Sequence, residues 1–131
     1  MSPLTPLILL CAVPVIAYFA TRRRAPQRTW TISGAAFGAV VSPLALGLYS
    51  LYFLSSWGFI PGMLGLVLTL VHGWPGFRIA TLSGVVSSGV VNGTSSSLAI
   101  ELINGLVWAA FYGLIGLMVD RARRRRVATH P

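Results

Sequence analysis

The sequence predicts an all-α integral membrane protein with three transmembrane helices and a half-membrane helical hairpin. Apolar residues make up 55% of the 131 residues and charged residues only 9%, whereas a typical soluble domain carries roughly 25% charged residues. Between residues 30 and 119, only Arg78 and Glu101 are charged. So few charges cannot cover the surface of a soluble fold, and so apolar a chain is not disordered. We expect residues 1–131 to form a single membrane domain.

The first predicted span covers residues 4–20 and contains Pro14, which we expect to kink it. A cleaved signal peptide carries positive charge before its apolar stretch. Here the arginines follow the stretch, at residues 22–24. We therefore interpret this segment as an uncleaved span, at the short end of what crosses a bilayer.

The second predicted span covers residues 30–54, after a short basic loop. Trp30 stands at one end, and Tyr49 and Tyr52 stand near the other. Aromatic residues at both ends suit the two membrane interfaces. Pro43 falls near the middle and predicts a second kink.

Residues 55–97 allow two interpretations. Two short apolar stretches flank the segment 72–77, which carries a Pro-Gly turn signal. Stretches of about 10–15 residues favour re-entrant or interfacial segments over full spans. We therefore predict a half-membrane hairpin at about 57–93. The alternative is that both stretches cross the membrane, which gives five spans and leaves the C-terminus on the same side.

The last predicted span covers residues 98–119, with Ser97 as its N-cap, and residues 120–131 form a basic tail. At 100° per residue, one face of this span collects small and polar side chains and the other collects apolar ones. The small and polar face comprises Glu101, Asn104, Gly105, Trp108, Ala109, Tyr112, Gly113 and Gly116. We expect this face to pack inside the protein.

The net charge of +8 comes from two arginine clusters that adjoin apolar runs. Because positive residues stay in the cytoplasm, we expect a bacterial inner membrane protein with its N-terminus outside and its C-terminus inside. The clusters would fix this topology and attract anionic lipid, so the lipid bilayer is an expected partner and nucleic acid is not. The arginines concerned are Arg22, Arg23, Arg24, Arg121, Arg123, Arg124, Arg125 and Arg126.

Small residues recur at helical spacing on two of the predicted spans. Such ridges let helix backbones approach closely in a membrane. We predict helix packing, either within one chain or between copies, through Gly34, Gly38 and Ser42 on the second span and Gly105, Ala109 and Gly113 on the last.

Glu101, Asn104 and Arg78 form a candidate intramembrane polar site. Glu101 lies roughly 11 Å outward from the centre of the last span at 1.5 Å per residue, just below the outer interface. A structural role near the helix start and a functional role as a proton or cation site both remain open. In the three-span topology, Arg78 can approach Glu101.

Neither a catalytic set nor a cofactor or metal site is indicated. The single cysteine, Cys11, excludes an internal disulfide, and His72 has no clustered ligands near it in the sequence. We therefore expect no enzyme and no cofactor.

The chain is interpreted as an accessory or assembly subunit that packs against other membrane proteins or itself; no substrate is indicated. In topology alone it resembles three-span holins, which would imply a pore former, although the 55–97 insert departs from them. A third interpretation is a small transporter that couples through Glu101.

Overall fold

The computed structural model describes residues 4–54, 58–84 and 94–129, and every regular element in these ranges is a helix. Three helical segments are long and apolar enough to cross a membrane: Leu4–Arg24, Pro26–Phe53 and Leu98–Arg126. The prediction of an all-helical chain with three such helices is therefore confirmed.

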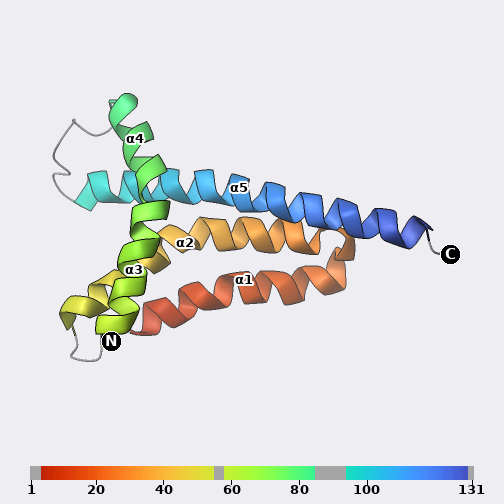
Figure 1. The fold of residues 1–131 in the computed structure, drawn as a ribbon, viewed down its shortest axis with the longest axis horizontal. Helices are drawn as coiled ribbons and strands as arrows, with labels where there is room; N and C mark the ends of the chain where they lie inside the picture. Colours follow the sequence, from red (N-terminus) through yellow and green to blue (C-terminus); the bar gives the residue numbers. More distant parts are fainter. Residues whose placement is uncertain (1–3, 55–57, 85–93, 130–131) are drawn as a thin grey trace.

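The first two long helices form an antiparallel pair (Figure 1). Helix α1 spans Leu4–Arg24 and α2 spans Thr29–Leu54, and only Ala25 and the 3-10 turn η1 (Pro26–Arg28) separate them. The expected basic loop is thus mostly helical, because α1 continues through its arginine cluster. A connection this short forces the second helix to return beside the first.

The last helix, α5, spans Thr94–Thr129 and is 36 residues long. At 1.5 Å per residue its length is about 54 Å, well beyond the roughly 30 Å of a hydrocarbon core. It begins at Thr94, so the expectation that Ser97 caps it is wrong: Ser97 lies within the helix. It also continues past Val119 into the basic tail.

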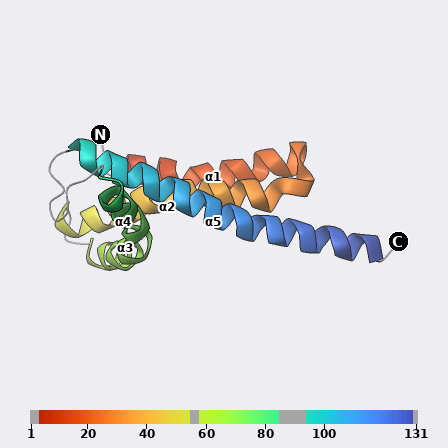
Figure 2. The ribbon, with the colours of Figure 1, turned by 90° about the horizontal axis from the view of Figure 1, so that it is seen from above.

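Helices α3 (Phe59–His72) and α4 (Trp74–Leu82) meet at a bend of 40°. Together they run crosswise to the three long helices (Figures 1 and 2). The chain does not reverse at 72–77, because Gly73 keeps right-handed helical angles (φ −79°, ψ −27°) and Pro75 occupies the first turn of α4, where its ring is tolerated. The two helices therefore form a bent rod and not antiparallel arms of a hairpin.

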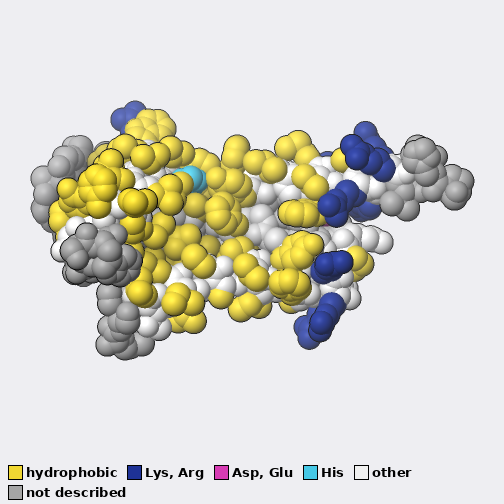
Figure 3. Space-filling view, turned by 60° about the horizontal axis from the view of Figure 1, so that its bottom comes forward, with side chains coloured by type: hydrophobic (Ala, Val, Ile, Leu, Met, Phe, Trp, Pro, Cys, Tyr) yellow, Lys and Arg dark blue, Asp and Glu magenta, His cyan; other side chains and the backbone are white. Residues whose placement is uncertain are grey.

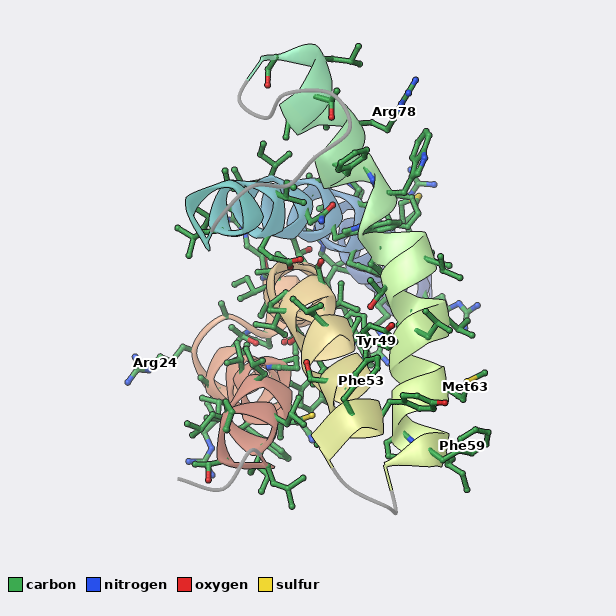
Figure 4. All side chains as sticks on the ribbon, turned by 90° about the vertical axis from the view of Figure 1, so that its left-hand side faces the viewer. Arg24, Tyr49, Phe53, Phe59, Met63 and Arg78 are labelled. Carbon is green, nitrogen blue, oxygen red and sulfur yellow. The ribbon has the colours of Figure 1, made fainter. Side chains whose placement is uncertain are left out.

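Helix α2 is the centre of the bundle, with α5, α3 and α1 packed around it (Figure 4). Glycines allow the close approaches. A Cβ at Gly34 would meet the carbonyl of Tyr112, and one at Gly38 would meet the carbonyl of Trp108. On α5, Gly116 lies against the Trp30 carbonyl. The structure thus brings the two small-residue ridges together within one chain.

The other ridge residues lie at the same contact with looser spacing. A Cβ at Gly105 would stand 3.1 Å from the Ala39 carbonyl oxygen, and one at Gly113 would stand 3.4 Å from the Cβ of Ala35. Ser42 is buried and Ala109 is partly buried. Gly113, unlike Gly38, therefore has room for a methyl group.

Large apolar side chains cover much of the outer surface, as Figure 3 shows over one face. The dark blue arginines of the two clusters gather at one end of the long helices, at the C-terminal ends of α1 and α5. The apolar band is bounded on that side by a belt of positive charge, a pattern typical of a membrane protein.

Candidate functional site

The break between α3 and α4 leaves backbone groups that the helix itself does not satisfy. Pro75 has no N–H, and Gly76 lies in the first turn of α4, where N–H groups lack helical acceptors. In hydrocarbon, each unsatisfied group costs several kcal/mol, so another part of the protein must bond to it.

Asn104 on α5 bonds to both sides of this break. Its Oδ1 accepts a hydrogen bond from the backbone N–H of Gly76 at 2.6 Å, and its Nδ2 donates to the Gly73 carbonyl at 3.2 Å. The Asn104 side chain has no solvent exposure (0%). A carboxamide suits this position because it carries a donor and an acceptor side by side. The candidate polar residue Asn104 is therefore occupied in joining α4 to α5.

Trp108, one turn further along α5, bonds to the last residue of α3. Its Nε1–H donates to the His72 carbonyl at 2.8 Å. The rings of His72 and Trp108 also pack together, with centroids 4.5 Å apart. Trp108 is thus a second side chain of α5 that supports the bend.

His72 is buried and its two ring nitrogens both have partners. Nδ1 lies 3.0 Å from the Leu68 carbonyl oxygen, and Nε2 lies 3.0 Å from the hydroxyl of Tyr112. A carbonyl can only accept, so Nδ1 carries a hydrogen. In the neutral ring Nε2 is then an acceptor, and the Tyr112 hydroxyl donates to it. This assignment follows from the hydrogen-bond network.

Asn104, Trp108 and Tyr112 therefore form a row that recurs every four residues on one face of α5. Residues four apart on a helix stand one above the other. The sequence indicates this inward face, but the residues that it meets, His72 to Gly76, are mostly recognised through their backbone. We call this set of contacts the bend clasp.

Glu101 lies outside the bend clasp, in a groove of about 290 Å³ between α2 and α5. Its Oε2 atom is buried and has no hydrogen-bond partner within the described part of the chain. The rest of the lining is apolar or small: Ala39, Pro43, Leu98, Leu102, Gly105, Leu106 and Ala109. A carboxylate oxygen among such groups is costly unless a donor reaches it.

Arg78 does not pair with Glu101 in the described part of the chain, contrary to the approach considered from the sequence. Its guanidinium lies 5.6 Å from the centre of the Trp74 ring. Gly76 and Ala80 face α5, and Arg78, two residues from each, points away on the opposite side of α4 (Figure 4). Two lone charges therefore remain on different faces of the bundle.

Asp120 forms a second polar contact at the other end of α5, which the sequence did not reveal. Its carboxylate accepts hydrogen bonds from the backbone N–H groups of Trp30 (3.3 Å) and Thr31 (2.9 Å), and from the Thr31 hydroxyl (2.8 Å). It thereby caps the first turn of α2, where N–H groups lack helical partners and the helix dipole favours negative charge.

The basic tail adds to this contact. The guanidinium of Arg123 lies 5.1 Å from the centre of the Trp30 ring, close enough for a cation–π interaction. The remaining arginines of the two clusters include Arg22 to Arg24, Arg121 and Arg124 to Arg126, which are all exposed. Arg124 also donates from Nε to the backbone carbonyl of Asp120 at 3.4 Å.

Comparisons of the chain with protein-family models, with curated proteins and with solved structures found no match. Among the described ranges 4–54, 58–84 and 94–129, no three His, Cys, Asp or Glu side chains gather as a metal site would require. The site is therefore interpreted from its own geometry: a bend clasp whose side chains are hydrogen-bonded, and a groove lined by a carboxylate with one unpartnered oxygen.

Proposed function

We propose that this chain is a non-catalytic protein of the bacterial inner membrane that acts through helix packing, as an accessory or assembly subunit of a membrane complex. The groove that contains Glu101 carries the proposal. The buried polar groups of the bend clasp bond to one another, whereas the Glu101 Oε2 has no donor among the described residues. A helix seated in this groove would cover its apolar lining and bring a donor to the Glu101 carboxylate that lines it.

Three crossings by α1, α2 and α5 fit the charge distribution. The arginines that end α1 and follow Asp120 on α5 lie at one end of the bundle. The positive-inside rule makes this end cytoplasmic, with the N-terminus outside. Counting from Asp120 at the inner boundary, Asn104 lies about 24 Å across the bilayer at 1.5 Å per residue. The bent rod of α3 and α4 then occupies the outer half of the membrane.

The five-span alternative fits these dimensions less well. Helix α3 has 14 residues and α4 has 9, so their lengths are about 21 Å and about 14 Å at 1.5 Å per residue. Neither reaches the roughly 30 Å of a hydrocarbon core. Their crosswise direction relative to α5 also supports a position within one leaflet (Figure 1).

A photoreactive amino acid placed in the groove tests the proposed function in native membranes. Leu102 lines the groove and is 61% exposed, while Leu114, on the same helix and outside the groove, is 60% exposed. We expect irradiation to give discrete protein adducts from position 102 and lipid adducts from position 114. Lipid adducts alone at both positions would contradict a packing function at this groove.

A transporter that couples through Glu101 is the second candidate, and the unpartnered carboxylate oxygen favours it. Purified protein in liposomes with an internal pH dye distinguishes the two. A transporter of this kind should dissipate an imposed proton gradient, and Glu101→Gln should abolish the leak while leaving the protein inserted. The packing function predicts the same gradient decay for wild type, Glu101→Gln and empty liposomes.

A further inference from the structure

The two lone charges of the apolar region lie at the same level along α5. Gly76 of α4 bonds to Asn104, and Ala80, one turn later, packs against Ile100. On α4, Arg78 lies between these two contact residues. On α5, Glu101 lies between Ile100 and Asn104. Both charges therefore lie at about the same depth in the membrane, within a stretch of α5 that is about 4 residues or roughly 6 Å long at 1.5 Å per residue.

The charges nevertheless face opposite sides of the protein. Arg78 points away from α5 on the outer side of α4 (Figure 4). The groove opens beside Leu102 and Leu106, which lie about 200° around α5 from Ile100 and Asn104 at 100° per residue. A single chain cannot join the two charges without dismantling the bend clasp.

Each charge is surrounded by exposed apolar side chains. Trp74, Ile79 and Leu82 are exposed around Arg78, and Leu98, Leu102 and Leu106 are exposed along the Glu101 groove. Two apolar faces at equal depth, each with one charge of opposite sign, are complementary to one another. In a medium of low dielectric constant, pairing of these charges is strongly favoured over leaving either alone.

We propose that the occupant of the groove is a second copy of this chain, whose Arg78 reaches Glu101. This inference rests on the proposed packing function and names its partner. The contact is head-to-tail, since one copy contributes the outer face of α4 and the next contributes the groove between α2 and α5. Such a contact repeats from copy to copy and gives a ring or an open row in the membrane plane.

Complementation between two variants tests this arrangement. Arg78→Gln removes the guanidinium and keeps the groove; Glu101→Gln removes the carboxylate and keeps the guanidinium. We expect each variant alone to lose self-association at least tenfold, measured by co-isolation of two differently tagged copies from lipid nanodiscs. Mixing the two variants should restore association, but only as pairs. The Arg78 of the Glu101→Gln copy can reach the Glu101 of the Arg78→Gln copy, and the reciprocal contact has neither charge.

Several results would overturn the inference. Failure of wild-type copies to co-isolate would overturn it. Undiminished self-association of the Arg78→Gln variant would also overturn it, since residue 78 lies on the surface and the variant should fold normally. Failure of the mixture to form pairs would exclude the head-to-tail contact. If position 102 crosslinks only to a different protein, the second-copy inference fails while the packing function stands; if it crosslinks to no protein, both fail.

Discussion

Asn104 accepts a hydrogen bond from the backbone N–H of Gly76 at 2.6 Å, across 28 residues of sequence. The same side chain donates to the Gly73 carbonyl at 3.2 Å, so one carboxamide spans the break between α3 and α4. Because backbone groups at a helix break need partners in hydrocarbon, this contact explains how a short bent rod can lie against α5 within a membrane.

Replacing Asn104 with leucine should destabilise the protein strongly. The substitution keeps the approximate size but leaves the Gly76 N–H without its partner, at a cost of about 1–3 kcal/mol for that unsatisfied group. The Gly73 carbonyl loses its bond to α5 and keeps the one from the Phe77 N–H. Thermal unfolding in detergent, followed by circular dichroism, measures the effect. Leu114→Ala, on the lipid-facing side of α5, is the control and should change the melting temperature little.

Alanine substitutions should distinguish the glycines that touch a neighbouring backbone from Gly113, which has room for a methyl group. Gly38→Ala places a Cβ against the Trp108 carbonyl, and Gly116→Ala places one against the Trp30 carbonyl, so both should lower the melting temperature. Gly113→Ala meets its nearest neighbour at 3.4 Å and should be nearly neutral. Equal effects at Gly38 and Gly113 would contradict the close approach of α2 and α5.

Removing the Asp120 carboxylate should loosen the arginine-rich end of the α2–α5 contact. Asp120→Ala eliminates three hydrogen bonds to the first turn of α2, and loss of a helix cap typically costs about 0.5–2 kcal/mol. We expect a lower melting temperature and faster amide hydrogen exchange at Trp30 and Thr31. Arg121→Ala, at the adjacent exposed position, serves as the control; if it has the same effect, the cap is not responsible.

Tyr112→Phe should cost about 0.5–1.5 kcal/mol, the usual net contribution of one hydrogen bond. The variant deletes only the hydroxyl that donates to His72 Nε2. The ring nitrogen spectrum of His72 should keep a protonated Nδ1, because the Leu68 carbonyl still accepts from it. Tyr52→Phe, at an exposed position on α2, is the matched control. A protonated Nε2 in the wild type would contradict the hydrogen-bond assignment.

The long helices could be predicted from the sequence because a long run of uncharged, mostly apolar residues is enough to indicate each of them. In a bilayer, such a run has few structures open to it other than a spanning helix. The inward face of α5 also followed from its period, which placed Asn104, Trp108 and Tyr112 on one side. Their partners could not be predicted. Asn104 recognises backbone groups of Gly73 and Gly76, and backbone groups are the same at every position.

The turn expected at 72–77 and the role of Asp120 show the same limit. A Pro-Gly pair is compatible both with a tight turn and with the first turn of a helix, and packing of α4 on α5 selects the second. Asp120 has Arg123 and Arg124 one turn away, a spacing that favours a local ion pair on one helix. The structure instead directs its carboxylate to α2, a contact that depends on how two helices 89 residues apart are aligned.

The contact of α4 with the N-terminal half of α5 is the central claim, and a cysteine pair tests it most directly. In a Cys11→Ser background, Ala80→Cys with Ile100→Cys places two thiols within one buried cluster. The pair Ala80→Cys with Ile115→Cys places the second thiol about 22 Å further along α5 at 1.5 Å per residue. Membranes are treated with a mild oxidant, and a maleimide mass tag then reports the free thiols. We predict an intramolecular disulfide for residues 80 and 100 and none for 80 and 115. The reverse result would contradict the crosswise packing of the rod on α5.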